Sequence, residues 1–259
     1  MAITLRSRRE IELMKKAGKV VAEVLLKLKD SAVPQVSTAE LNRIAEDITR
    51  QMGAIALFKG VKNPGGGKDF PAAICASLNQ QVVHGIPSEN VRLQEGDILS
   101  IDFGVKLNGY CADAAVTLAI GKIDNDKQRL MDATKEMLDI AIQHSRAGVK
   151  WSDIAGRMQK CAESAGFAVV TDFVGHGIGT QMHEDPKVPN FVSDELLKRD
   201  IFLQAGMILA VEPMVNMGTS SVITLNDGWT VVTKDRKPSA HFEHTIAVAE
   251  NGCEVLTIK

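Results

Sequence analysis

The chain contains 259 residues, of which 45% are hydrophobic and 24% charged, and its formal net charge at pH 7 is −2. This composition is ordinary for a globular protein, and the length allows a hydrophobic core for one large domain or two small ones. The near-neutral charge argues against nucleic acid as the main partner. No apolar run is long enough to span a bilayer, no apolar segment follows the basic N-terminal residues, and scattered cysteines favour free thiols in the cytoplasm.

Two helices are expected at the start of the chain. Apolar residues recur at helical spacing over residues 7–29, and Pro34 prevents this helix from continuing. Ser37 and Glu40 have the spacing of a capping box, which predicts a second helix that stops at Gly53.

Strands are expected over residues 54–58 and 74–83. The glycine-rich segment Asn63–Lys68 lies between them. It lacks the Gly-Lys-Ser/Thr ending and the helix start of a phosphate-binding loop, so a plain mobile loop is the favoured interpretation.

A β-hairpin is predicted around Asn108-Gly109, because two β-rich runs flank this dipeptide and it is typical of two-residue turns. With such a turn Asp102 pairs with Ala115, and Asp113 lies on the same face as a diagonal neighbour, about 7–8 Å away at Cα. A three- or five-residue loop would place the two carboxylates on opposite faces. Two buried carboxylates this close require a cation, whereas a solvent-facing carboxylate does not.

The second half of the chain repeats the first. The segment Gly206–Glu212 has the sequence Gly-Met-Ile-Leu-Ala-Val-Glu and matches Gly96–Asp102, which reads Gly-Asp-Ile-Leu-Ser-Ile-Asp. Glu243, within Phe-Glu-His-Thr-Ile, matches Asp113, within Ala-Asp-Ala-Ala-Val. Matched acidic residues at corresponding strand positions are less generic than matched leucines, so the repeat indicates an internal duplication.

We therefore expect two α+β halves, approximately residues 1–120 and 121–259, within a single catalytic domain over residues 1–259. The sequence His-Gly-Ile also occurs in both halves, at His84 and at His176. Two such halves would face each other about a pseudo-twofold axis, where their carboxylate pairs would meet.

Four carboxylates with one imidazole form a ligand set that suits Mn, Fe, Co or Zn better than Ca. Four negative charges require two cations, and two cations about 3.5–4 Å apart can activate a water for hydrolysis. His176 among glycines is by itself more typical of a loop residue. His183 and His84 are candidate donors to a substrate carbonyl or amide.

The remaining histidines are assigned structural roles. Strand alternation places His241 on the face of Glu243 and His244 on the opposite face.

These motifs resemble those of the type I methionine aminopeptidases, in their short bacterial form, over essentially the whole chain. The resemblance implies a pita-bread fold, which is an α+β architecture with two pseudo-symmetric halves around a curved antiparallel sheet, in a cytoplasmic monomer. It is carried by Asp102, Asp113, His176 with His183, Glu212-Pro, Glu243-His-Thr, His84-Gly-Ile-Pro and Asp227-Gly-Trp-Thr.

The resemblance further implies two divalent cations per chain, which are Co, Mn, Fe or Zn. By this likeness Asp102 binds one cation, His176 and Glu212 bind the other, and Asp113 and Glu243 bridge both.

It also implies an activity. The enzyme removes the N-terminal methionine of nascent proteins and peptides, at the ribosome, when the second residue is small and uncharged. Glu212 would shuttle the proton, His183 would stabilise the oxyanion, and His84 would contact the nitrogen of the scissile amide.

A methionine pocket is implied at Phe70, Cys75, Met182 and Trp229. Sulfur and aromatic faces suit a thioether, although ordinary core packing also accounts for Trp229. Met182, where relatives often carry an aromatic, and the glycine segment Asn63–Lys68 depart from the family pattern.

Two alternatives remain at this stage. An Xaa-Pro aminopeptidase or dipeptidase would use the same fold and ligands, usually with a separate N-terminal domain. A non-catalytic pita-bread protein would only bind a protein or RNA, and such proteins typically lose ligands.

Overall fold

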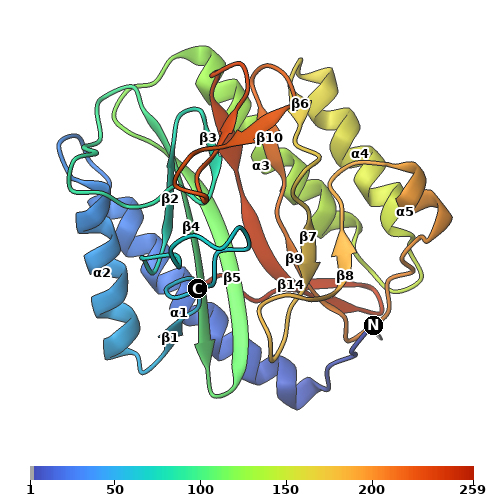
Figure 1. The fold of residues 1–259 in the computed structure, drawn as a ribbon. Helices are drawn as coiled ribbons and strands as arrows, with labels where there is room; N and C mark the ends of the chain where they lie inside the picture. Colours follow the sequence, from blue (N-terminus) through green and yellow to red (C-terminus); the bar gives the residue numbers. More distant parts are fainter. Residues whose placement is uncertain (1–2) are drawn as a thin grey trace.

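A computed structural model describes residues 3–259, which form an α+β fold around one large curved sheet (Figure 1). The helices are α1 (Arg8–Ser31), α2 (Thr38–Gln51), α3 (Asn125–His144), α4 (Trp151–Ser164) and α5 (Asp194–Lys198). The first strands are β1 (Ile55–Ala56), β2 (Cys75–Leu78), β3 (Gln81–Val83), β4 (Ile98–Leu107), β5 (Tyr110–Ala119), β6 (Ala168–Val169), β7 (Gly175–Gly177) and β8 (Glu184–Val188). The others are β9 (Ile208–Val211), β10 (Met214–Asn216), β11 (Val222–Thr224), β12 (Val231–Thr233), β13 (Ser239–His241), β14 (Glu243–Ala249) and β15 (Gly252–Val255).

The expected starts of the first two helices are confirmed. The Ser37 side chain accepts a hydrogen bond from the backbone N–H of Glu40 at the start of α2. Gly53, which follows this helix, has φ +68°, a left-handed conformation that favours glycine. A complete capping box stands at α1, where Ser7 and Glu10 each accept from the backbone N–H of the other.

The large sheet is antiparallel and has nine strands in the order β1-β4-β5-β14-β9-β7-β8, with β2 on β4 and β15 on β14. Strands β4 and β5 form the predicted hairpin, because Leu107 pairs with Tyr110 across the two-residue turn. Asn108 and Gly109 have φ +51° and +86°, as a type I′ turn requires.

Each half of the chain contributes an antiparallel strand pair to this sheet. β4 pairs with β5 in the first half, and β9 pairs with β14 in the second. β5 and β14 lie side by side at the centre, so the halves meet there. Gly96 and Gly206 precede β4 and β9 with nearly equal φ values of +93° and +94°, as the sequence match predicts.

The strand expected over residues 74–83 is in fact two strands in different sheets. β2 joins the large sheet through β4, whereas β3 pairs with β12 in a small three-stranded sheet with β11. The break occurs at Asn79, whose φ is +50°. Its side-chain amide donates a hydrogen bond to the Asp97 carboxylate, and its side-chain oxygen accepts one from the Ile98 N–H. Likewise, only residues 55–56 of the expected strand 54–58 pair with β4.

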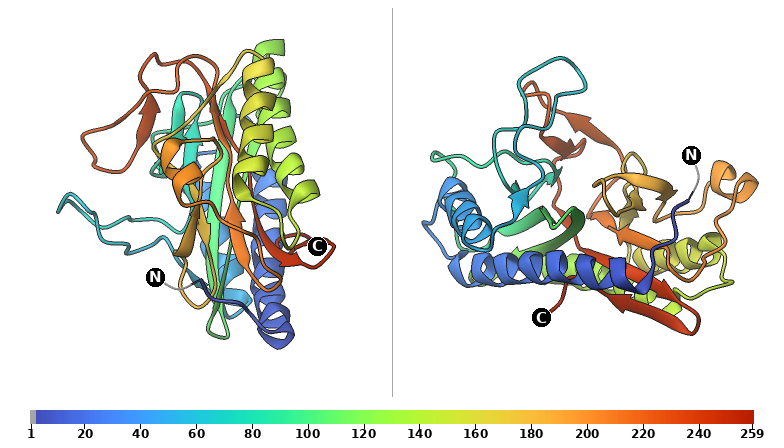
Figure 2. Two further views of the ribbon diagram at one scale, coloured as in Figure 1. Left: turned by 90° about the vertical axis from the view of Figure 1, so that its right-hand side faces the viewer. Right: turned by 90° about the horizontal axis from the view of Figure 1, so that it is seen from below.

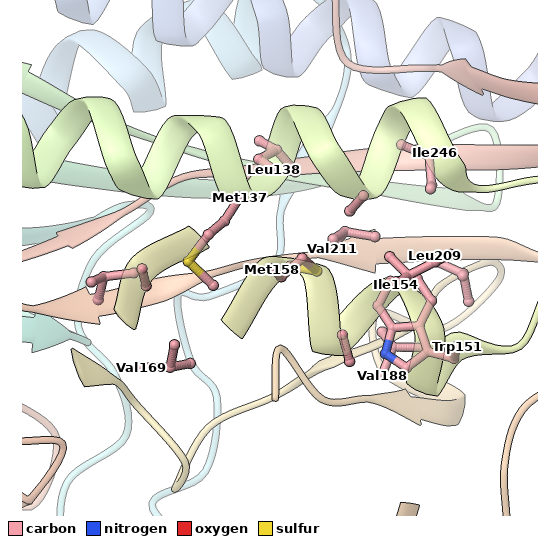
Figure 3. Close-up of a cluster of buried hydrophobic side chains, with 14 of the residues drawn as sticks. Met137, Leu138, Trp151, Ile154, Met158, Val169, Val188, Leu209, Val211 and Ile246 are labelled. Atoms are coloured by element: carbon pink, nitrogen blue, oxygen red, sulfur yellow. The ribbon is translucent and has the colours of Figure 1, made fainter. Parts of the chain in front are cut away.

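Helices α1, α3 and α4 pack on one side of the large sheet (Figure 2). One hydrophobic core lies between α1 and alternate residues of β4 and β5, including Ile101, Phe103 and Ala114. The other lies between α3, α4 and alternate residues of β9 and β14, among them Leu209 and Ile246 (Figure 3). Because strand side chains alternate, Asp102 and Asp113 lie on the opposite face of β4 and β5 from Ile101, Phe103 and Ala114. Within residues 3–259, no helix is long and apolar enough to cross a membrane.

Candidate metal centre and substrate cavity

Strand register places three of the predicted acidic residues on one face of the sheet. Asp102 on β4 pairs with Ala115 on β5, which in turn pairs with Glu243 on β14. Asp113, two residues before Ala115, lies opposite Gly104. A Cβ at Gly104 would lie 3.1 Å from the Asp113 Oδ1, so glycine leaves room for this carboxylate. The face is the one opposite Phe103 and the helices.

The remaining two residues come from the neighbouring strands β9 and β7. Glu212 follows β9 directly, and His176 on β7 pairs with Ala210 of β9. The His176 Nε2 lies 3.6 Å from the Glu212 Oε1. The backbone at Glu212 is held by Asn190, whose side-chain amide donates a hydrogen bond to the Glu212 backbone carbonyl oxygen at 3.0 Å.

Side-chain atoms of Asp113, His176 and Glu243 that could bind a metal ion all lie within 4.8 Å of one another, and all three residues are buried. The His176 Nδ1 is 2.9 Å from the Gly177 carbonyl oxygen. A proton on Nδ1 satisfies that contact and leaves the Nε2 lone pair free for a cation. Burial, reinforced by His183, lowers the pKa of His176 to about 4, so the ring is neutral near pH 7.

The carboxylates are held where their charge is disfavoured. Burial raises the pKa values of Asp102, Glu212 and Glu243 well above their usual range, and the repulsion of Asp113 adds to each shift. Burial also raises the pKa of Asp113 to about 7. Such a cluster is stable near neutral pH only with protons or cations among its members.

Within the described residues, three buried oxygens of this cluster have no hydrogen-bond partner: the Asp102 Oδ1, the Asp113 Oδ1 and the Glu243 Oε1. Buried acceptors are normally satisfied, and unsatisfied oxygens around a neutral imidazole are what a transition-metal ion would coordinate. The residues present therefore fit a metal ion, and the cluster is a candidate metal-binding group.

The cluster opens into a cavity of about 740 Å³. His183 lies beside His176, with ring centroids 4.4 Å apart. The His84 ring meets the Phe173 and Trp229 rings edge to face, with ring centroids 5.6 and 6.3 Å apart. The cavity is lined by every residue that the sequence analysis placed at the site: Phe70, Cys75, His84, Asp102, Asp113, His176, Met182, His183, Glu212, Trp229 and Glu243.

Beside the acidic cluster, one side of the cavity is formed by an apolar wall, which consists of Phe70, Cys75, Met182 and Trp229. Phe70 and Trp229 meet edge to face at 5.3 Å, and Met182 packs on the same group of side chains. Cys75 pairs with Asp102 across β2 and β4, and burial raises its pKa well above the usual range, so its thiol is neutral. Because Trp229 borders the cavity in this separate cluster, it lies outside the two cores beneath the helices.

The expected loop at Asn63–Lys68 is confirmed, and it reaches the apolar wall. The Trp229 Nε1 donates to the Lys68 carbonyl oxygen at 2.8 Å, and the Asn63 amide donates to the Gly228 carbonyl oxygen at 3.2 Å. The loop is therefore tied to the cavity through residues far away in the sequence.

His241, which the sequence analysis treats as structural, also lies at the centre. Its Nε2 is buried and lies 3.9 Å from the Glu212 Oε2, and it has no hydrogen-bond partner among residues 3–259. Burial lowers its pKa to about 3, so it is neutral. The sequence feature that indicated this position is strand alternation, which places His241 on the same face as Glu243. His244 points to the other side, where it contacts Thr257 at 2.8 Å.

Comparisons with known proteins agree with this chemistry. Residues 12–250 match the profile of Metallopeptidase family M24. The methionine aminopeptidase of Clostridium perfringens (strain 13 / Type A) is 47% identical over 256 residues, which cover 99% of each chain. The crystal structure of methionine aminopeptidase from Thermotoga maritima has a TM-score of 0.93 and 40% identity, with 100% of both chains covered.

The X-Pro aminopeptidase of Thermotoga maritima MSB8 has a TM-score of 0.74 at 21% identity, over 98% of this chain and 62% of that one, a likeness of fold alone. The pita-bread fold is thus confirmed, whereas the similarity that extends to sequence over the full chain is to methionine aminopeptidases. This chain belongs to metallopeptidase family M24 and, within it, to the methionine aminopeptidases.

Proposed function

We propose that the cavity hydrolyses the first peptide bond of a chain that begins with methionine and has a small, uncharged second residue. The observation that carries this proposal is the convergence of four acidic residues and one imidazole next to an apolar wall, within a single cavity. The acidic cluster supplies the hydrolytic chemistry, and the wall supplies selectivity for an apolar side chain.

Two divalent cations, Co, Mn, Fe or Zn, are proposed to bind at the cluster. Four carboxylates carry four negative charges when ionised, which two such ions neutralise. When bound, the ions would polarise the substrate carbonyl and lower the pKa of a water toward neutrality. The proposed ligands are Asp102, Asp113, His176, Glu212 and Glu243.

The remaining polar residues have roles toward the substrate. Glu212 is proposed to carry the proton from the attacking water to the leaving amine. His183 donates to the developing oxyanion, and His84 contacts the nitrogen of the scissile amide. Burial lowers the pKa values of both histidines, to about 4 for His84, so both act as neutral rings near pH 7.

Phe70, Cys75, Met182 and Trp229 are proposed to hold the methionine side chain. Two sulfur atoms and two aromatic faces match the polarisable thioether of methionine. The partner is the N-terminal segment of a nascent protein, which this cavity would receive at the ribosome. We further propose that the chain acts as a monomer in the cytoplasm and that its two halves form one catalytic domain.

The activity is tested with two tripeptides and the protein loaded with Mn²⁺ or Co²⁺. Met-Ala-Ser is expected to lose its methionine, and Ala-Pro-Ala is expected to stay intact over the same time, both followed by chromatography. The reverse preference would support an Xaa-Pro aminopeptidase. Turnover of neither peptide, together with no retained transition metal after purification, would support a non-catalytic binding protein.

Trp229→Ala tests the apolar wall. Loss of the indole removes about 1.5–3 kcal/mol of apolar contact, so KM for Met-Ala-Ser is expected to rise about tenfold or more, with a smaller change in kcat. Trp151, fully buried beneath the sheet, is the matched control, because Trp151→Phe should lower the melting temperature and leave KM unchanged. A Trp229 variant that lost stability without any rise in KM would assign this residue to core packing.

A further inference from the structure

The loop that presents Met182 and His183 to the cavity is folded around one carboxylate. The Glu184 Oε1 accepts hydrogen bonds from the backbone N–H of Thr180 at 2.8 Å, from the backbone N–H of Gln181 at 3.0 Å and from the Thr180 hydroxyl at 3.3 Å. The position of Glu184 therefore determines the path of the backbone that leads to His183.

The other oxygen of Glu184 is held by Arg6, from the N-terminal segment. The Arg6 Nη2 donates to the Glu184 Oε2 at 2.5 Å, and the Arg6 Nη1 lies 3.5 Å from the Glu10 Oε1. Only 8% of the Arg6 side chain is exposed. Its backbone N–H donates to the Gly206 carbonyl oxygen at 2.7 Å. Burial acts to raise the pKa of Glu184, but hydrogen bonds from Gln181 and Arg6 keep it below the usual value.

The Arg6 guanidinium also fills the space beside Gly179, the residue before Thr180. A Cβ at Gly179 would lie 2.1 Å from the Arg6 Nη2, so a side chain at this position would displace the guanidinium. On its other side the loop is tied to the hairpin, because the Cys111 N–H donates to the Gly179 carbonyl oxygen at 2.7 Å. The loop is thus held between the hairpin and the N-terminal segment.

A buried ion pair contributes little net stability, because the cost of desolvation offsets much of the attraction. A planar guanidinium instead supplies directed hydrogen bonds, which fix the orientation of the carboxylate that accepts them. The main consequence of the Arg6 and Glu184 contact is therefore geometric. The histidine that depends on it, His183, lies beside His176 of the candidate metal centre.

We propose that Arg6 is a positioning residue of the active site, which acts through Glu184 to hold His183 at the reacting carbonyl. The N-terminal segment that carries Thr4 and Arg6 then belongs to the catalytic unit. Arg6 stabilises the 179–183 loop through Glu184, and Thr4 lines the cavity. The inference rests on the proposed function, because it assigns a task to His183 in that reaction.

A double-mutant cycle tests the proposal with the metal-loaded protein and Met-Ala-Ser. Arg6→Ala is expected to lower kcat/KM by about 10–100-fold in the otherwise unchanged chain, since displacements of about 1 Å can cost about 100-fold. In a His183→Ala background the same change should lower kcat/KM by less than about threefold, because the positioned group is already absent. Arg6→Lys should recover part of the loss.

Arg50 provides the matched control. It forms an exposed ion pair with Asp47 at 2.6 Å on α2, so Arg50→Ala should leave kcat/KM unchanged. An unchanged rate in Arg6→Ala, or an equal loss in both backgrounds, would overturn the proposal. If Arg6→Ala does not fold, Glu184→Gln enters the same cycle, because it keeps the side-chain shape and replaces the oxygen that Arg6 contacts.

Amide hydrogen exchange separates this inference from the proposed function. Arg6→Ala is expected to speed exchange at Thr180 and Gln181 about tenfold or more, whether or not the peptide is cleaved. Unchanged exchange at both amides would show that Arg6 does not hold the loop. An unmodified protein that fails to cleave Met-Ala-Ser would instead contradict the proposed function alone.

Discussion

Replacement of Glu243 with alanine is expected to lower kcat/KM for Met-Ala-Ser at least about 1,000-fold while the chain stays folded. Glu243 is 2% exposed, stands in register with Asp102 through Ala115 and is one of three residues whose ligating atoms cluster within 4.8 Å. Loss of its charge would weaken cation binding and, with it, the stabilisation of the oxyanion in the transition state. A loss of about 4 kcal/mol of transition-state stabilisation corresponds to about 1,000-fold in rate.

Glu243→Gln distinguishes charge from packing at this position. The glutamine has nearly the same volume, so it should also be inactive if the carboxylate is required. Metal content after dialysis and circular dichroism show whether binding is lost and whether the fold persists. A kcat/KM near that of the unchanged protein in either variant would contradict the proposed bridging role.

Asp113→Asn is expected to stabilise the metal-free protein at pH 8 and, at the same time, to abolish turnover of the metal-loaded protein. Burial raises the pKa of Asp113 from 3.8 to about 7. The folded state therefore binds this proton more tightly than the unfolded chain, and the contribution of Asp113 to the free energy of unfolding falls as pH rises from about 4 to about 7. An asparagine side chain never ionises, so the variant escapes a penalty of up to about 4 kcal/mol.

This penalty corresponds to an increase of about 5–15 °C in the melting temperature at pH 8, measured after chelation. At pH 4 the metal-free variant and the unchanged protein should melt at similar temperatures, because Asp113 is then protonated. Added Mn²⁺ should stabilise the unchanged protein more than the variant. Asp172→Asn, at an exposed position, is the control. Equal melting temperatures for the metal-free variant and the metal-free unchanged protein at pH 8 would contradict this effect of Asp113.

Local patterns in the sequence predicted the part of the site that belongs to the hairpin. The dipeptide Asn108-Gly109 favours a two-residue turn, and a two-residue turn leaves only one register for β4 and β5. With alternation of period two, that register places Asp102 and Asp113 on one face. The repeat extended the same reasoning to Glu212 and Glu243.

Other positions depended on contacts that no local pattern reports. The strand expected over 74–83 is split because Asn79 turns the chain and its side chain accepts a hydrogen bond from the Ile98 N–H, a few residues before Asp102. His241 lies beside Glu212 because two different strands end at the same place. Neither outcome follows from propensity, since each depends on how distant strands are stacked.

Local sequence signals specify where the first two helices begin, how the hairpin turns, and which acidic residues share a face, because these depend on backbone preferences and periodicity within a few residues. The side chains that complete the cavity, by contrast, depend on how the distant parts of the chain pack together. Arg6 and Glu184 are 178 residues apart, and Asn63 reaches Gly228 across 165. Such pairs form only once the curved sheet has brought both halves together, since side-chain contacts depend on positions in space rather than on spacing in the chain.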